Sequence, residues 1–301
     1  MNIFRNKKML CAALLATCVA AGCSNGQSAD ASSSSASAAP ASEINVLTRE
    51  DGSGTRSAFI ELFGVEQKQD DGSKKDLTTP KAAVTNSTSV MLTNVSADPN
   101  AIGYVSMGSL NDTVKSVNID GAAAETANVE NGTYKISRPF NLVYKESNLS
   151  EPAADLIAFI NSKEGQTIVA EEGYIPVADA GAYQKSGASG KVTVSGSSSV
   201  TPLMQKIVEA YQTANGDVTV EIQQSDSSSG ISDATDEISD LGMSSRELKD
   251  EEKSAGLTTL TIANDGIAVI VSPENEISEL TSDDVQKIYT GEITEWSQVS
   301  K

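Results

Sequence analysis

Guanidinium groups, hydroxyls and glycines lie close together in the segment Thr48–Arg56 (TREDGSGTR), which follows the apolar run Ile44–Leu47. Glycines let a backbone approach a ligand closely, and the unpaired N–H groups in the first turn of a helix favour an anion. Arginine adds planar, permanently charged donors that suit an oxyanion. The segment therefore predicts either a cradle for a tetrahedral oxyanion or an ordinary capping turn, because Gly- and Ser-rich turns before helices are common.

Three further loops repeat this design, at Ser195–Val200 (SGSSSV), Ser225–Gly230 (SDSSSG) and Asp240–Arg246 (DLGMSSR). Each follows a short apolar run and places hydroxyl donors at an expected helix N-terminus, where they can cap the helix or bind a ligand. Capping explains a single loop of this kind best. Four of them in one chain favour a shared ligand.

Short β-like runs alternate with helix-like stretches in the rest of the chain, which predicts an α/β fold. The expected strands are Ile44–Leu47, Ala101–Val105, Phe140–Tyr144, Lys191–Val194, Val218–Ile222 and Gly266–Val271. The expected helices are Ser57–Phe63, Ala153–Ile160, Gly165–Glu171, Pro202–Thr213 and Ser282–Tyr289. The Gly-, Ala- and Ser-rich segment Gly181–Gly190 indicates a linker.

The chain has 301 residues, a formal charge of −19 and no histidine. Its length allows one large or two medium domains. Without the first 22 residues, 19 basic side chains face 41 acidic ones, a charge of −22 that repels nucleic acid and anionic membrane surfaces. The absence of histidine removes the commonest general base and metal ligand. We therefore predict no catalytic residue, no metal site and no cofactor, and we regard a phosphatase as disfavoured.

The N-terminus has the pattern of an export signal. Arg5, Lys7 and Lys8 precede the apolar run Met9–Ala21, which is too short to span a membrane comfortably. The run ends in VAAGC, which looks like a bacterial lipobox with Cys23 as the lipidated residue, although ordinary signal cleavage is the alternative. Residues 24–42 are nearly all small or polar and predict a flexible tether. This layout is typical of an exported receptor tethered to the outer face of a bacterial cell membrane.

Six motifs together resemble segments of the bacterial phosphate-binding proteins, the substrate-binding components of ABC-type phosphate importers. They are REDGSGTR at Arg49–Arg56, SGSSSVTPL at Ser195–Leu203, QSDSSSG at Gln224–Gly230, GMSSREL at Gly242–Leu248, DGIAVIV at Asp265–Val271 and YTGEITEW at Tyr289–Trp296. The resemblance covers nearly all of residues 44–301. It implies inorganic phosphate as ligand, ABC transporter permease subunits as partners, a monomer, and a membrane contact through the lipid anchor alone.

The order of these motifs differs from that of the family. Residues 44–180 resemble the family's second half and residues 191–301 its first half, so we predict a circular permutant in which residues 181–190 join the usual termini. The new ends, near Ile44 and Lys301, should then be neighbours in space. A permutation at exposed connections is physically tolerable.

The resemblance implies a two-lobed periplasmic-binding-protein-like fold of type II, with the anion enclosed between the lobes. The two crossing strands are expected at Thr133–Asn141 and Thr261–Ile267. The lobe that carries the DGSGTR loop should comprise residues 44–136 and 268–301, and the second lobe residues 139–262.

The family's phosphate contacts carry over to hydroxyls and backbone donors in both expected lobes. Ser199 and Ser228 match hydroxyl donors of one lobe, and Asp51 matches the acid that holds the binding arginine. Val200 and Ser229 would add backbone N–H groups at helix starts. The contacts expected from the opposite lobe are Arg49, Ser53, Gly54 through its backbone, and Thr55.

Ser245 stands where enteric members of the family have an aspartate, which accepts the proton of the phosphate and repels fully ionised sulfate. Asp226, Glu50 or Asp265 could supply a substitute carboxylate. We expect Asp265 in this role, with a surface turn as its alternative. Receptors for sulfate, molybdate or tungstate share this architecture and stay open as an alternative. For Arg56 and Arg246 the alternative to a ligand contact is a surface ion pair, which we prefer for Arg246.

Overall fold

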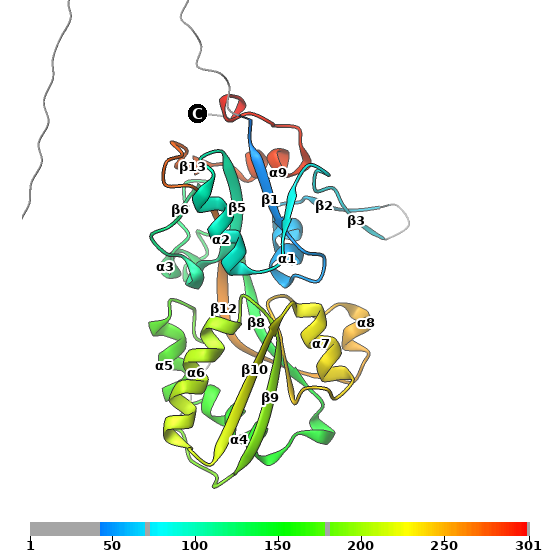
Figure 1. Cartoon of the computed structure of the whole chain (residues 1–301), viewed down its shortest axis with the longest axis vertical. Coiled ribbons are helices and arrows are strands. Elements are labelled where there is room, and N and C mark those ends of the chain that lie inside the picture. Colours follow the sequence, from blue (N-terminus) through cyan, green and yellow to red (C-terminus); the bar gives the residue numbers. More distant parts are fainter. Residues whose placement is uncertain (1–42, 70–72, 178–180, 300–301) are drawn as a thin grey trace, which may run out of the picture. The chain divides into compact units, whose positions relative to one another are not determined.

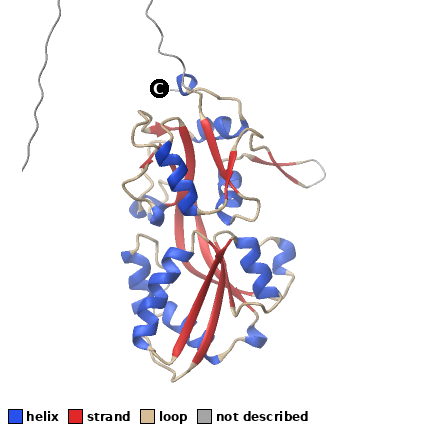
Figure 2. Ribbon diagram, viewed as in Figure 1, coloured by secondary structure: helices blue, strands red, loops and turns tan. Residues whose placement is uncertain are grey.

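The computed structural model describes residues 43–69, 73–177 and 181–299, drawn as a cartoon in Figures 1 and 2. The predicted export signal (residues 1–22), Cys23, the tether to residue 42 and Lys301 lie outside these residues. Within the described ranges, every helix is too short or too polar to cross a lipid bilayer.

Most of the described strands belong to one nine-stranded sheet in the order β10-β9-β11-β8-β12-β5-β1-β4, with β6 also paired to β12. Their bounds are β1 Asn45–Arg49, β4 Ala83–Thr85, β5 Ala101–Ser106, β6 Lys115–Ser116, β8 Ser137–Tyr144, β9 Gly190–Ser197, β10 Val218–Ser225, β11 Leu241–Ser244 and β12 Thr258–Val271. Two small sheets pair β2 (Glu66–Lys68) with β3 (Lys74–Asp76) and β7 (Asn118–Ile119) with β13 (Glu279–Leu280). All six predicted strands are present.

Strand β12 joins the two parts of the sheet. Its first half, to Gly266, pairs antiparallel with β8, and its second half, from Ile267, pairs antiparallel with β5. β8 and β12 are therefore the crossing strands that the family resemblance implies (Figure 1). β8 begins later than predicted, at Ser137, because the preceding residues form a turn with Gly132 at a φ of 76°.

The five predicted helices are found within a few residues of their expected bounds, since each has the local signals that start a helix. A serine or threonine side chain caps α1, α2, α4, α5 and α9, and Pro152 and Pro202 stand in the first turns of α4 and α6. The helices are α1 Gly54–Leu62, α2 Thr88–Ala97, α3 Thr126–Glu130, α4 Glu151–Ile160, α5 Lys163–Glu171, α6 Thr201–Ala214, α7 Ser227–Thr235, α8 Asp250–Lys253 and α9 Ser282–Thr290. Short 3-10 turns occupy Met107–Ser109, Glu146–Asn148 and Trp296–Gln298.

Helix α2 was not predicted from the sequence. It contains several threonine, serine and asparagine residues of low helix propensity, and Met91 and Val95, one turn apart, are its fully buried apolar side chains. Its position is set by the packing of these two residues against Gly103 of β5, where a Cβ would collide with both. Tertiary contact therefore outweighs local propensity in this helix.

The hydrophobic core consists of two main clusters. In the first, Phe59 of α1 stacks on Tyr104 of β5 with ring centroids 3.9 Å apart, and Tyr289 of α9 packs against both rings. This cluster combines residues 44–136 with residues 267–299, which are distant in the sequence. The second cluster lies within residues 140–263 and includes the side chains of α4, α5 and α6. We propose that the two clusters are the cores of two lobes.

The first and last segments that the structure describes, near residues 43 and 299, lie side by side at the first of these cores. The Ile44 N–H donates to the carbonyl of Thr294 at 2.8 Å, and Glu43 forms an antiparallel bridge with Glu295. This contact is what the predicted circular permutation requires of the new termini.

The segment 181–190, where the permutation would join the usual ends, is held to the second core by Asp155 of α4. The carboxylate of Asp155 accepts hydrogen bonds from the Tyr183 hydroxyl at 2.6 Å and from the Ser186 N–H at 3.1 Å. Tyr211 of α6 and Asn215, directly after that helix, donate to it as well. Burial alone would raise the pKa of Asp155, but these four hydrogen bonds lower it to about 2.

Asp155→Asn is therefore expected to lower the free energy of unfolding by about 1–3 kcal/mol at pH 7, because the buried donors lose a charged acceptor. The folded-state pKa lies below the ordinary value of 3.8, so this contribution is complete above about pH 4 and is lost as the pH falls towards 2. Urea unfolding of both proteins across this range measures it. Asp217→Asn, which changes an exposed carboxylate near the same segment, should leave stability within about 0.5 kcal/mol.

Candidate anion-binding site

The hydroxyl-bearing loops converge at the carboxyl ends of parallel strands. β1 leads into α1 in one part of the sheet, while β9 leads into α6 and β10 into α7 in the other. Ser245 follows β11, which is parallel to β9. Ligand sites of α/β sheets form at such strand ends, beside the N-termini of the following helices.

Arg49, the last residue of β1, supplies the positive charge. Its side chain is only 3% exposed, and its Nη2 donates to Ser198 Oγ at 2.9 Å. Nε and Nη2 also donate to the two carboxylate oxygens of Glu50, at 2.8 and 2.7 Å. This two-point ion pair fixes the plane of the guanidinium group and directs it towards the loop after β9.

Two threonines at the starts of α1 and α2 contact two serines in the loop after β9. Thr55 Oγ1 lies 2.7 Å from Ser199 Oγ, and Thr88 Oγ1, in the first turn of α2, lies 3.3 Å from the same oxygen and 3.4 Å from Ser198 Oγ. All four hydroxyl-bearing residues are buried. Each hydroxyl can donate or accept, so together they can rearrange around an anion.

Ser245 lies at the centre of a second set of hydroxyls. It receives a hydrogen bond from Ser197 Oγ at 3.0 Å, and its own N–H donates to Ser227 Oγ at 3.0 Å. A Cβ added to Gly54 would collide with Ser227 Oγ and lie 2.7 Å from Ser245 Oγ, so only glycine allows α1 to approach these serines so closely. We call the combined group the hydroxyl cluster; its members are Thr55, Thr88, Ser197, Ser198, Ser199, Ser227 and Ser245.

The predicted partner of Arg49 is wrong. Asp51 was expected to hold this arginine, but its side chain is 97% exposed and forms an ion pair with Arg56 instead. Arg56 pairs with Asp76 as well, at 2.8 Å. It therefore forms ion pairs, as the alternative to a ligand contact predicts. Glu50 takes the role expected of Asp51, because it follows Arg49 directly and both of its oxygens reach the guanidinium group.

The expected donors of the QSDSSSG loop are displaced by one residue. Ser227 is fully buried in the hydroxyl cluster, whereas Ser228 is half-buried and its hydroxyl accepts from Arg246 Nη2 at 3.0 Å. The N–H of Ser229 donates to Asp226, which caps α7. The sequence contains a signal for this register, since an Asp226 N-cap makes Ser227 the first residue of the helix.

Val200 and Ser53, two more of the expected donors, lie at the starts of helices. The Val200 N–H donates to the carbonyl of Ser197 at 3.1 Å, in the turn that begins α6. Ser53 Oγ accepts from the N–H of Arg56 at 3.3 Å and so caps α1. Since Ser53 occupies the N-cap, the N–H groups of Gly54 and Thr55 are the first two of α1, which have no acceptor within a helix.

Asp265 is fully buried but does not contact the hydroxyl cluster, and the predicted surface turn is excluded as well. It pairs with Arg138, and burial raises its pKa to about 6 although Arg138 and Ser106 favour the charged form. Arg246 forms an ion pair with Glu252 at 2.7 Å, but the expected surface position is wrong, because the Arg246 side chain is only 5% exposed and that of Glu252 16%.

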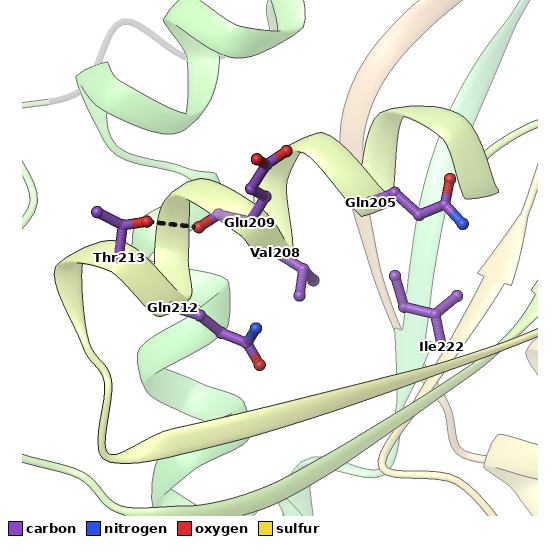
Figure 3. Close-up of a pocket in the computed structure, with 6 residues that line it drawn as sticks. All are labelled: Gln205, Val208, Glu209, Gln212, Thr213 and Ile222. Atoms are coloured by element: carbon purple, nitrogen blue, oxygen red, sulfur yellow. Dashed lines mark hydrogen bonds between the residues drawn. The ribbon is translucent and has the colours of Figure 1, made fainter.

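An open groove of about 430 Å³ lies apart from the hydroxyl cluster, between α6 and β10 (Figure 3). Its described lining contains no cationic side chain, and the carboxylate of Glu209 at its edge would repel an anion. The lining residues are Gln205, Val208, Glu209, Gln212, Thr213 and Ile222. The groove therefore does not compete with the hydroxyl cluster as an anion site.

Comparison with known proteins places most of the chain in a family. Residues 22–164 and 181–301 match the model of the PBP superfamily domain. A phosphate-binding protein PstS 2 of Streptococcus agalactiae is 54% identical over 283 residues, which cover 94% of each chain. A phosphate-binding protein PstS 2 of Streptococcus pneumoniae is 43% identical over 258 residues, which cover 85% of this chain and 87% of the relative.

A solved structure is also similar over most of its length. The crystal structure of a phosphate-binding protein of a phosphate ABC transporter from Streptococcus pneumoniae superimposes with a TM-score of 0.68 at 41% identity, and covers 86% of this chain and 100% of that chain. The phosphate-binding protein PstS of Bacillus subtilis, by contrast, aligns over 114 residues only, 37% of this chain, at 30% identity.

Proposed function

Because the chain belongs to the family of bacterial phosphate-binding proteins, we propose that it binds inorganic phosphate at the hydroxyl cluster and Arg49, and delivers it to an ABC-type import permease. One observation carries this proposal. A buried arginine from one part of the sheet and buried hydroxyls from both parts converge within hydrogen-bonding distance of one another.

In this proposal the guanidinium group of Arg49 balances the charge of the anion, and the hydroxyls of the cluster turn their protons towards its oxygens. The first N–H groups of α1, at Gly54 and Thr55, add fixed donors at the positive end of a helix dipole. Because the donors come from two lobes, the ligand favours the closed arrangement, and closure presents a surface that a permease can recognise. The protein performs no catalysis in this role.

Isothermal titration calorimetry with phosphate tests this function. We expect one phosphate bound per chain and no binding of a neutral polyol of similar size. The proposal would be contradicted if the titration gave no heat of binding and millimolar phosphate did not raise the melting temperature of the protein.

A receptor for a fully ionised oxyanion such as sulfate, molybdate or tungstate is the second candidate. The composition of the hydroxyl cluster favours it. Ser245 stands where enteric members of the family have an aspartate, and the seven residues of the cluster are all serines or threonines. Competition calorimetry decides between them, since sulfate at an equimolar concentration should leave phosphate binding intact if a carboxylate accepts the phosphate proton. Efficient competition by sulfate would mean that no such acceptor contacts the ligand.

Glu50 should position Arg49 for the ligand, and Asp51 should not. Glu50→Gln removes the charge that orders the guanidinium group, so we expect phosphate affinity to fall about 10-fold while the melting temperature stays within about 2 °C. Asp51→Asn is the matched control and should change affinity less than threefold. If Asp51→Asn weakens binding more than Glu50→Gln, the contacts of Arg49 in the bound state differ from those described above.

We further propose that residues 1–22 are an export signal and that lipidated Cys23 and the tether hold the protein, as a monomer, on the outer face of the cell membrane. The sequence pattern VAAGC and the transport role of the family support this. Mass spectrometry of the N-terminal peptide from cells tests it, because an unmodified or differently cleaved terminus would exclude the anchor.

A further inference from the structure

A buried ion pair on the crossing strands is left without a role by the site described so far. Arg138 of β8 and Asp265 of β12 stand opposite each other in the antiparallel register. Arg138 donates from Nε and Nη2 to one oxygen of Asp265, at 3.2 and 3.1 Å, and Ser106 Oγ donates to the other at 2.9 Å. The side chains of Arg138 and Asp265 are 2% and 0% exposed.

One donor of this pair has no partner. Arg138 Nη1 is buried and has no hydrogen-bond acceptor among the described residues. A charged donor without an acceptor costs more free energy than a neutral one, so proteins seldom leave such a group in their interior unless a ligand completes it. Asp265 occupies the opposite side of the guanidinium group and thereby fixes the direction of the free N–H.

The free donor belongs to the same region as Arg49. β1 and β5 are parallel neighbours, with Asn45 opposite Ala101. This register places Arg49, at the end of β1, beside the end of β5 at Ser106. Ser106 in turn donates a hydrogen bond to Asp265. Burial lowers the pKa of Arg138, the contacts with Asp265 raise it, and the charge of Arg49 lowers it further, so the two guanidinium groups repel each other. An anion between them would relieve this repulsion.

We propose that Arg138 is a second guanidinium ligand of the bound anion, which it contacts through Nη1 from the crossing strands. Asp265 then acts as the positioning partner of Arg138 and does not accept the proton of the ligand. The inference rests on the proposed binding of phosphate at Arg49 and the hydroxyl cluster. It adds to that site a contact from the segment about which the two lobes would close.

The competing interpretation is that the pair only ties β8 to β12. A double variant, Arg138→Gln with Asp265→Asn, distinguishes the ligand role from the purely structural role. It removes both charges together and leaves no unpaired buried ion. We expect it to bind phosphate about 10- to 100-fold more weakly than the wild-type protein in calorimetry. Asp155→Asn is the stability control, since it weakens the fold far from the site and should leave phosphate affinity unchanged.

Arg138→Lys provides a second measurement in case the double variant does not fold. It keeps the charge and the partner Asp265 but lacks the fork that reaches Asp265 and the anion at once, so we expect about a 10-fold loss of phosphate affinity at a melting temperature close to that of the wild type. Phosphate affinity within threefold of wild type in Arg138→Lys, or in a folded double variant, would overturn the inference. Absence of phosphate binding by the wild-type protein would instead remove the proposed function itself.

Discussion

Arg49→Ala is expected to lower phosphate affinity by at least about 1,000-fold, which in practice abolishes binding. The guanidinium group supplies several charge-assisted hydrogen bonds, each worth about 1.5–3 kcal/mol. It also provides local positive charge in a chain whose formal charge is −19, and the field of that negative charge repels anions at longer range. Calorimetry with phosphate measures the loss.

The fold should survive this change. Removing Arg49 leaves Glu50, whose side chain is 23% exposed and can therefore be hydrated. Lys81→Ala is the matched control, because it removes an exposed positive charge without touching the hydroxyl cluster, and it should change affinity less than twofold at physiological salt. Phosphate affinity of Arg49→Ala within 10-fold of wild type would remove Arg49 from the site.

Gly54→Ala should have the next largest effect, a loss of phosphate affinity of about 100-fold. Its Cβ would collide with Ser227 Oγ and lie 2.7 Å from Ser245 Oγ, distances that real Cβ atoms do not adopt. Either the hydroxyls of Ser227 and Ser245 rotate out of the hydroxyl cluster or the loop after β1 moves away from them. In both cases the donors of the two lobes can no longer surround one anion. Tryptophan fluorescence or calorimetry with phosphate measures the change.

The same substitution should not unfold the protein. Gly54 is the first residue of α1, and alanine is a better helix former than glycine by about 1 kcal/mol. Gly216→Ala, where the nearest atom to a new Cβ is the Gln212 carbonyl oxygen at 3.7 Å, should behave as the wild type. Wild-type phosphate affinity in Gly54→Ala would show that the two lobes need not approach as closely as described.

The contact between the described chain ends supports the proposed permutation. The streptococcal relatives align over nearly the whole chain, whereas the Bacillus subtilis protein aligns over about a third of it. A different order of the two halves would produce this pattern, because a linear alignment can match only one half at a time. A structural superposition of the halves one by one onto the Bacillus subtilis protein would test it.

The α/β class and most elements followed from the sequence, since strands such as Val218–Ser225 and helices such as Thr201–Ala214 have clear local signals. Apolar spacing, a proline in the first turn and serine caps act over a few residues and are therefore readable in one dimension. Helix α2 has a serine cap as well, but many of its residues have low helix propensity, and packing of Met91 and Val95 against Gly103 sets its position.

The motifs of the sequence also indicated which loops meet, but the tertiary structure decided which atoms do. Asp51 and Glu50 are neighbours that both follow Arg49, and only the direction of the chain after β1 turns Glu50 inward and leaves Asp51 in solvent. Ser227 and Ser228 differ in the same way, by one residue or about 100° around α7. Asp265 meets Arg138 across 127 residues through the register of β8 and β12. Composition and spacing therefore determined the kind of site, while strand register and side-chain direction, which depend on contacts between distant segments, selected its members.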